Sequence, residues 1–496
     1  MSLRFRTQIA FASAVVLLVA GTAMPGQAND TGISPAVCGP GDIPEPGIQG
    51  EVPLGATPNY NCGVKLVGQL PGGGAVQGNG ICAYRRSPGN LIDVINVSDP
   101  ANPFLTHSVP YSTPPGGGSE TMRAVVAADR AVLVQGRSVF EISDCLNPVF
   151  KGNIDWPNVR LNIPFAVSLL PHDLRVSPDG RTVYASFGMW EVDISNLDDP
   201  STWTLTDHRC DLAAQIPGPW KELHRQTIDA GLDLCTDQAT PAGIPRFGAG
   251  NTLGISLLHG AVLWPSISHT IAVRGDSTLT YLGDQAGGTQ SAFAPEPTTQ
   301  IVDVTQDPPK ILGSVRGPGH GLDWFRTANG TEYVLQTNEG GTNGIAGFPG
   351  GDTCQPYPRT SRLGWGFEVI VSDVTNPRSA RNVSMLTIAI NEPEFCDVRQ
   401  ASGNDPWTSQ TMVDNPNNAR FAAVNFGQGA AVGAGLRIFD IRKPRFPREV
   451  AYFNHGNLNH AGASHYDAAR RLLYVPGGNA FWVLQIEPHV VQKLGL

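Results

Sequence analysis

Four histidines stand at the head of predicted strand pairs, where their side chains could bind one metal ion. Each precedes a β-rich run that leads into a turn, in "PHDLRVSPDG", "SHTIAVRGDS", "GHGLDWFRTANG" and "NHAGASHYD". Imidazole is a good ligand for Zn, Cu, Fe and Ni. If the fold brings these positions together, the sequence predicts a transition-metal site made of His172, His269, His320 and His460. No motif for an organic cofactor accompanies them.

Two other residues take the same position when the strand pairs are aligned on their turns. Gln410 does so in "SQTMVDNPNNARFAAVNF", and Arg123 approximately in "TMRAVVAADRAVLV". We expect both to contact a small substrate, because an arginine can bind a carboxylate through two parallel hydrogen bonds. His172, His320 and Arg123 are the expected catalytic groups. A metal with open positions offers Lewis-acid or redox chemistry, so lyase and oxidoreductase are the expected reaction classes.

A structural role is the alternative for the histidines. Polar side chains at strand ends commonly satisfy backbone groups of their own sheet, and a repeat copies such residues along with its fold. His465 also competes with His460 for its position. Under this alternative the chain is a non-catalytic interaction protein at the cell surface. It would bind an extracellular protein or glycan through its long loops.

A repeated strand pattern must position these residues. An apolar strand ends near Asp, and a turn with Asp or Asn before Pro follows, for example in "LIDVINVSDPANP" and "TQIVDVTQDPP". With the strand pair that precedes it, each unit has about four strands, the size of a propeller blade. Seven units lie at 76–110, 120–156, 170–208, 268–316, 318–390, 409–453 and 459–486. We predict an all-β, seven-bladed β-propeller, with six or eight blades as alternatives.

The last unit lacks its outer strand, whereas "VKLVGQL" at 64–70 precedes the first unit without a partner. We expect this N-terminal strand to complete the last blade and close the ring, which removes an open sheet edge. The innermost strands of a propeller run along a central channel, so their first residues surround one mouth. The aligned histidines would therefore face one another there.

At these strands the sequence resembles the LVIVD-repeat family of β-propellers, from about residue 62 to 486. The resemblance implies the fold but no particular function, because propellers serve as enzymes, binding platforms and scaffolds. Residues 209–267 and 340–364 are insertions outside the repeat. We expect three segments: a signal peptide at 1–28, an N-terminal extension at 29–61 and the propeller at 62–496.

The N-terminus has the pattern of an export signal, with Arg4 and Arg6, an apolar run at 9–21 and "GQA" before Asn29. The net charge of −9 becomes about −11 once these two arginines are removed. An acidic chain without basic runs is not expected to bind nucleic acid or anionic membranes. We expect a secreted, periplasmic or envelope-located monomer without a membrane span after cleavage.

All eight cysteines follow the signal, and an even count in an exported chain favours disulfides. Cys210 with Cys235 and Cys354 with Cys396 would each staple an insertion. Cys38–Cys62 and Cys82–Cys145 are the remaining pairs, although eight cysteines allow many other connectivities.

Carboxylates recur inside the repeat, and we expect them to stabilise the blades through hydrogen bonds instead of forming a paired-carboxylate active site. These residues are Asp93, Asp193, Asp303, Asp373 and Asp440. Asp284 and Glu339 are expected to satisfy turn backbone, with orientation of the histidines as the alternative. The sequence contains no GxSxG, no HExxH and no calcium-loop motif, so a serine hydrolase is not supported.

Overall fold

The computed structural model describes most of the chain. The described residues are 34–113, 121–156, 159–161, 167–169, 173–186, 189–208, 211–212, 215, 268, 270–283, 298–317, 319–337, 369–395, 397–398, 408–426, 433–456 and 464–496.

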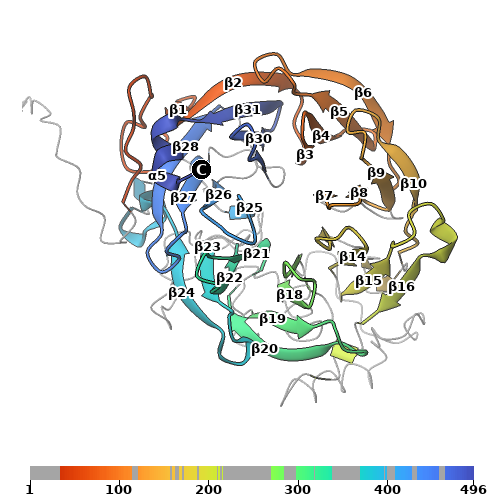
Figure 1. Ribbon diagram of the computed structural model, residues 1–496. Coiled ribbons are helices and arrows are strands. Elements are labelled where there is room, and N and C mark those ends of the chain that lie inside the picture. Colours follow the sequence, from red (N-terminus) through yellow and green to blue (C-terminus); the bar gives the residue numbers. More distant parts are fainter. Residues whose placement is uncertain are drawn as a thin grey trace, which may run out of the picture.

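Seven antiparallel sheets of four or five strands stand in a ring around a central axis (Figure 1). The chain is a seven-bladed β-propeller, as the repeat predicts. Within a blade, consecutive strands pair in chain order from the axis to the rim. Blade 1 comprises β3 (Val76–Asn79), β4 (Cys82–Ser87), β5 (Leu91–Asn96) and β6 (Phe104–Pro110). Blade 2 comprises β7 (Met122–Val126), β8 (Ala131–Gln135), β9 (Ser138–Glu141) and β10 (Val149–Asn153). Blade 3 comprises β13 (Leu174–Val176), β14 (Thr182–Ala185), β15 (Trp190–Asp193) and β16 (Thr204–Asp207).

The later blades follow the same order, and the last two also receive a strand from the N-terminal part of the chain. Blade 4 comprises β17 (Thr270–Val273), β18 (Leu279–Gly283), β19 (Thr298–Asp303) and β20 (Lys310–Arg316). Blade 5 comprises β21 (Leu322–Arg326), β22 (Glu332–Gln336), β23 (Val369–Asp373) and β24 (Arg381–Leu386). Blade 6 comprises β25 (Thr408–Val413), β26 (Phe421–Phe426), β27 (Gly435–Asp440), β28 (Arg448–His455) and β1 (Asn59–Cys62). Blade 7 comprises β29 (His465–Asp467), β30 (Leu472–Pro476), β31 (Ala480–Ile486) and β2 (Val64–Pro71).

Outside the blades, the described regular structure is short. β11 (Val159–Leu161) pairs with β12 (Val167–Leu169) between blades 2 and 3 of the chain. The helix α5 (Pro488–Leu494) follows the last strand, and its Val490, Val491 and Leu494 are buried. The 3₁₀ turns are η1 (Pro200–Thr202), η3 (Pro377–Ser379), η4 (Ala389–Asn391) and η5 (Pro393–Phe395).

The ring closes through β2, which pairs with β31 from Val64 opposite Ile486 to Pro71 opposite Ala480. The prediction that "VKLVGQL" completes the last blade is confirmed. The sequence pattern did not reveal that β1 joins blade 6 as a fifth strand, beside β28. Gly63 joins β1 to β2 with φ +68° and lies against Val490, so that only a residue without a side chain fits this turn.

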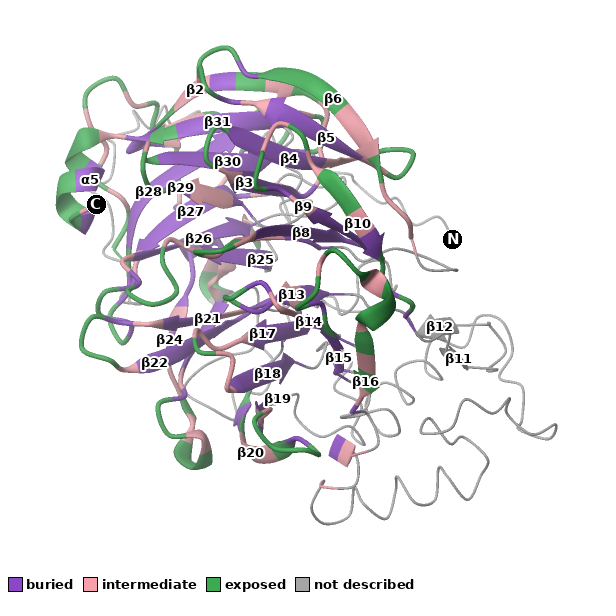
Figure 2. Ribbon diagram, turned by 45° about the vertical axis from the view of Figure 1, so that its right-hand side comes forward, coloured by how far each residue is buried: buried purple, intermediate pink, exposed green. Residues whose placement is uncertain are grey.

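The core lies mainly between neighbouring blades, because the Val-, Ile- and Leu-rich strands present one face to each neighbour. Between blades 2 and 3, for example, Trp156 stacks on Trp190 with ring centroids 6.1 Å apart. Figure 2 shows middle strands such as β8 and β30 buried and the rim strands β6 and β10 largely exposed. A closed ring thus holds its innermost side chains in fixed relation to one another.

The repeated aspartates stabilise turns in four of five cases. Each of the four accepts a hydrogen bond from the backbone N–H two residues further on, at 2.8–3.2 Å: Asp193, Asp303, Asp373 and Asp440. Asp93 differs, because it is buried and pairs with Arg85 at 2.6 Å. It also accepts a hydrogen bond from the Ser108 hydroxyl at 2.7 Å, so it joins three strands of blade 1. The expected role of hydrogen bonds that stabilise the blade is confirmed for all five.

An N-terminal strap, residues 34–62, lies along blade 6 and is fastened by buried charges. The Arg437 guanidinium is fully buried and contacts Glu45 at 2.7 Å and Glu449 at 3.0 Å. Gln49 in the strap donates to Glu449 at 2.8 Å. Burial, partly offset by Arg437, raises the pKa of the Glu449 carboxyl. The strap is therefore part of the folded domain.

Two disulfides join described residues, Cys38–Cys62 and Cys82–Cys145, and both pairings are confirmed. They indicate an oxidising compartment. Cys210, Cys235, Cys354 and Cys396 lie outside the described residues, as do the segments 1–28 and 340–364 and nearly all of 209–267. None of the helices in the described part of the chain has the length and apolarity to cross a membrane.

Candidate functional site

The innermost strands of the seven blades position the candidate site. These strands are β3, β7, β13, β17, β21, β25 and β29. Successive inner strands lie against each other around the axis, as β7 does against β13 and β17 against β21. Side chains on neighbouring blades can therefore meet although they are far apart in sequence.

The structure describes three of the six predicted site residues. His320 is 3% exposed just before β21, and its backbone N–H donates to the Thr337 carbonyl at 3.0 Å. Gln410 on β25 and Arg123 on β7 are both buried. His172, His269 and His460 lie outside the described residues, so their meeting remains a prediction.

Arg123 connects blade 2 to blade 3. Its Nε donates to the Leu174 carbonyl oxygen at 3.1 Å, and its Nη2 lies 3.3 Å from Asp173 Oδ1. Both charged side chains are nearly inaccessible to solvent. The guanidinium thus binds a carboxylate of the protein itself at the position where a substrate carboxylate was expected.

Asp173 carries the contacts on to blade 4. Its Oδ2 accepts hydrogen bonds from the Thr270 hydroxyl and, at 3.4 Å, from the Ile271 backbone N–H. The same oxygen lies 3.7 Å from Arg175 Nη2. One carboxylate therefore joins the innermost strands of blades 2, 3 and 4.

Arg175 extends further and reaches blade 5. Its Nε donates to the Ile271 carbonyl at 2.8 Å, and its Nη2 donates to the Leu322 carbonyl and lies 3.4 Å from Asp323 Oδ1. The Thr411 hydroxyl, from blade 6, donates to Asp323 Oδ2. We refer to Arg123, Asp173, Arg175, Thr270, Asp323 and Thr411 as the axial cluster, which spans blades 2 to 6.

Burial changes the acidity of one member of the axial cluster. It raises the pKa of Asp323 from 3.8 to about 7, against the opposing effects of Arg123 and the Thr411 hydrogen bond. The nearby Asp173 charge raises it further. A carboxyl with a pKa near neutrality can accept or release a proton at physiological pH, as general acid–base chemistry requires. The cluster is therefore chemically unlike a surface ion pair.

The sequence reasoning missed Asp173, Arg175 and Asp323. Their signal is visible in "HDLRV" and "HGLDWF", where charged residues alternate with the buried Leu174, Val176, Leu322 and Trp324. In a strand, alternate residues point to opposite faces. A charged residue that alternates with core residues in an innermost strand therefore indicates a polar partner on the next blade.

The predicted site residues adjoin the axial cluster in sequence. His172 immediately precedes Asp173, His269 immediately precedes Thr270, and Gln410 immediately precedes Thr411. His320 stands three residues before Asp323, and Arg123 is itself a member. Five of the six predicted positions are thus in the axial cluster or within three residues of it; His460 is the exception.

His465 begins β29 and belongs to the packing of blades 7 and 1. Its ring stacks on Tyr474 with centroids 5.8 Å apart. It also lies so close to Gly78 of β3 that a Cβ there would stand 2.4 Å from the imidazole. Burial lowers the pKa of His465 to about 4, so the ring is neutral at physiological pH. Its tight packing is that of a structural side chain.

Two groups in the described part of the chain combine side chains that could bind a metal, and both lie at the N-terminal strap. In the first, Asp42 stands beside Cys38 and Cys62, but the disulfide uses both sulfurs. The second combines Asp42 with Glu487 and His489. The chain is thus a disulfide-bonded propeller with candidate metal ligands at its rim as well as the predicted ones at its axis.

No family model matches the sequence, and comparison with curated proteins finds no match either. Among solved structures, the β-propeller domain of Cps50 (Swd1) from Myceliophteria thermophila is 9% identical, with 86% of this chain and 100% of that chain covered and a TM-score of 0.45. A structure of U3-55K is 7% identical, with coverages of 87% and 99% and a TM-score of 0.42. Such values carry no functional argument.

Proposed function

We propose that this chain is an exported propeller whose axial channel mouth binds a transition metal and a small anionic substrate. The metal ligands are His172, His269, His320 and His460. The observation that carries the proposal is the hydrogen bond between Asp173 and Thr270. These residues directly follow His172 and His269 in sequence, so their contact supports convergence of the two imidazoles.

The donor set and its surroundings fit a transition metal. Imidazoles with an adjoining amide, Gln410, suit Zn, Cu, Fe, Ni or Mn. The neighbouring carboxylates of the buried Asp173 and the half-buried Asp323 are hydrogen-bonded, as is common for groups that orient metal ligands. When bound, the metal would supply Lewis-acid or redox chemistry, which fits the proposed lyase or oxidoreductase classes.

The protein's own groups have distinct tasks in this proposal. Arg123 and Arg175, whose own hydrogen bonds are made to the protein, contribute only their positive charge to attracting the substrate carboxylate. Asp323 holds or releases a proton near neutral pH, because burial raises its pKa to about 7. When Asp323 is protonated, the axial cluster has two arginines against one carboxylate, so anion binding strengthens as the pH falls through 7.

The test is elemental analysis of protein purified without chelators or nickel resin. The proposal expects about one transition-metal ion per chain at the axial site, reduced by His172→Ala or His320→Ala. His107→Ala is the matched control, because His107 is exposed on the rim strand β6 and should leave the metal content unchanged. Absence of metal in the wild type, with unchanged stability of both axial variants, would exclude the site.

A non-catalytic interaction propeller is the second candidate, and one observation favours it. The hydrogen bonds of Arg123 and Arg175 end on carbonyls and carboxylates of the next blades, as expected for a structural lock. In that case His172→Ala costs about 1–3 kcal/mol of stability through a lost buried hydrogen bond, and no metal is present. A protein or glycan partner would bind the inserted loops, and deletion of 211–234 would abolish its capture.

The proposal also includes export of the chain and its membership of the LVIVD-repeat family. The two disulfides support an oxidising location outside the cytoplasm. The repeated strand-and-turn segments "LIDVINVSDPANP" and "TQIVDVTQDPP", whose strands are β5 and β19, support membership of the LVIVD-repeat propellers. N-terminal sequencing of secreted protein, with Asn29 as its first residue, would test the export signal.

A further inference from the structure

Three side chains that can bind a metal meet where the propeller closes. They are Asp42 in the N-terminal strap and Glu487 and His489 at the start of α5. One ligand atom from each lies within 4.8 Å of the other two. The strap and α5 are at opposite ends of the chain, so the contact is between its first and last described segments.

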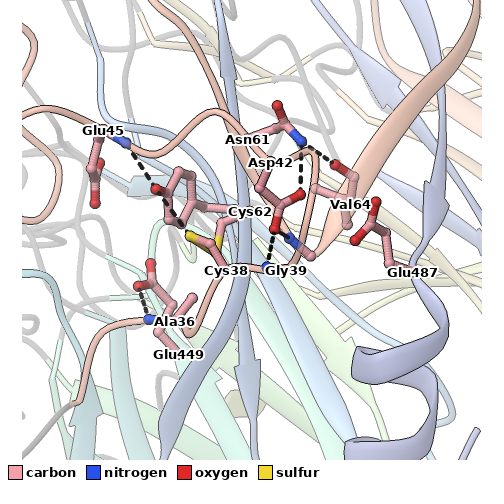
Figure 3. The surroundings of a disulfide bond; sticks show 12 residues. Ala36, Cys38, Gly39, Asp42, Glu45, Asn61, Cys62, Val64, Glu449 and Glu487 are labelled. Atoms are coloured by element: carbon pink, nitrogen blue, oxygen red, sulfur yellow. Dashed lines mark hydrogen bonds between the residues drawn. A yellow bond between two sulfur atoms is a disulfide. The ribbon is translucent and has the colours of Figure 1, made fainter.

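Asp42 is held in place by the backbone of the strap. Its Oδ2 accepts hydrogen bonds from the N–H groups of Gly39 at 2.6 Å and Gly63 at 3.0 Å, and its Oδ1 accepts from Asn61 at 3.2 Å (Figure 3). The Cys38–Cys62 disulfide spans the same turn. The carboxylate is therefore oriented before any ligand arrives, which lowers the entropic cost of binding.

Glu487 and His489 are positioned by the ring closure itself. The Glu487 backbone N–H donates to the Gly63 carbonyl at 3.0 Å, and in Figure 3 its carboxylate lies beside Asp42. His489 Nδ1 stands 3.5 Å from Glu487 Oε2. The imidazole also rests on Gly39, where a Cβ would stand 2.9 Å from His489 Cε1.

The charges around this group are unbalanced. Two carboxylates approach each other, and His489 is the one basic side chain of the described residues within ion-pair distance of either. Like charges at such a separation repel unless a cation lies between them. A divalent ion would relieve the repulsion and use the imidazole as a third ligand.

We propose that Asp42, Glu487 and His489 form a zinc-binding clasp between the N-terminal strap and α5. One imidazole and two carboxylates suit Zn²⁺, with water in the fourth position. Bond lengths of about 2.0–2.1 Å place tetrahedral ligands roughly 3.4 Å apart. The His489–Glu487 pair, at 3.5 Å, already has this spacing, and no other pair must close by more than about 1.4 Å. The side chain of His489, which is 40% exposed, has room for this shift.

The clasp has a structural task that is independent of the axial site. β1 and β2 enter blades 6 and 7 on either side of Gly63, and α5 packs against the same junction. An ion shared by the strap and α5 would hold both ends of the chain at the point of ring closure. Because zinc then binds only the folded form, it stabilises the closure by mass action.

Hydrogen–deuterium exchange of the oxidised full-length chain, titrated with zinc chloride, tests the clasp. Zinc should slow exchange at least tenfold in peptides covering 38–45 and 487–494, and raise the melting temperature by several degrees. His489→Ala should abolish the local protection, and Glu487→Gln should weaken zinc binding at least tenfold. His107→Ala, which removes an exposed histidine on β6, should behave like the wild type.

The proposal is overturned if zinc slows exchange in neither segment of the wild-type protein. It is equally overturned if the protection persists in both His489→Ala and Glu487→Gln. Without zinc, neither variant should melt more than about 1 °C below the wild type, because His489 is exposed and the half-buried Glu487 loses only its repulsion with Asp42. Zinc at the axial site alone would protect the innermost strands instead, so the failure of one site is distinguishable from that of the other.

Discussion

Arg175 Nη2 lies 3.4 Å from Asp323 Oδ1, although the two residues stand on blades 3 and 5 and are separated by 148 positions in sequence. The guanidinium passes the innermost strand of blade 4, to whose Ile271 carbonyl it donates a hydrogen bond. Ring closure thus places a cation and an acid from non-adjacent blades beside each other.

The stability of the metal-free protein should fall with rising pH because of Asp323. Its pKa is raised from 3.8 to about 7 in the folded state, so the unfolded chain releases this proton first as the pH rises. The shift corresponds to at most about 4 kcal/mol. Between pH 4.5 and 8, the free energy of unfolding of the wild type should therefore drop relative to Asp323→Asn by roughly 2–4 kcal/mol.

Urea denaturation at both pH values measures this difference. Asp155→Asn is the matched control, because its side chain is 97% exposed and its substitution should leave the pH dependence unchanged. If the wild type and Asp323→Asn lose stability in parallel, Asp323 does not titrate as described.

The buried ion pairs under the N-terminal strap should contribute far more to the stability of the fold than a similar ion pair at the surface. Arg437→Ala leaves Glu45 and Glu449 buried without their cation, which should cost about 3–5 kcal/mol. Arg442→Ala removes an equally short contact, 2.7 Å to Asp440, but this arginine is 44% exposed. It should cost below about 1 kcal/mol. Thermal denaturation of the two variants measures these losses of stability, and equal losses would refute this account.

The disulfide that closes the longer loop should contribute more to the stability of the fold. Their sequence separations are 24 for Cys38–Cys62 and 63 for Cys82–Cys145. Loop entropy then predicts losses of about 3.5 and about 4.3 kcal/mol for the double serine variants. Loss of the first pair should also open the strap to limited proteolysis, whereas loss of the second should not. Cleavage of the strap at equal rates in both variants would contradict this assignment.

The fold was predictable because its signals are local and repeated. Each blade carries its own alternating strands and Asp-containing turn, and the unpaired "VKLVGQL" has one obvious place in the ring. The fifth strand β1 was not predictable, since "NYNC" lacks an apolar pattern and depends on β28 and the Cys38–Cys62 bond for its place. Such a strand is defined by its tertiary partners.

The candidate site was predictable only in part. Alignment on the turns identified Arg123 and the sequence neighbours of Asp173, Thr270 and Thr411. It did not reveal that Arg175 crosses a blade, because no sequence pattern records how far a side chain extends across the axis. The ligands of the rim clasp, Asp42 and His489, were missed because they stand outside the repeat, 447 positions apart by their numbers.

The most direct test of the axial site is the metal content of chains purified in the His489→Ala background, which removes the rim clasp. This variant should retain about one transition-metal ion per chain, and the further substitution His172→Ala should release it while the fold is kept. If the His489→Ala chain carries no metal, or if its metal content is unchanged by His172→Ala and by His320→Ala, the axial cluster is a structural lock and not a metal site.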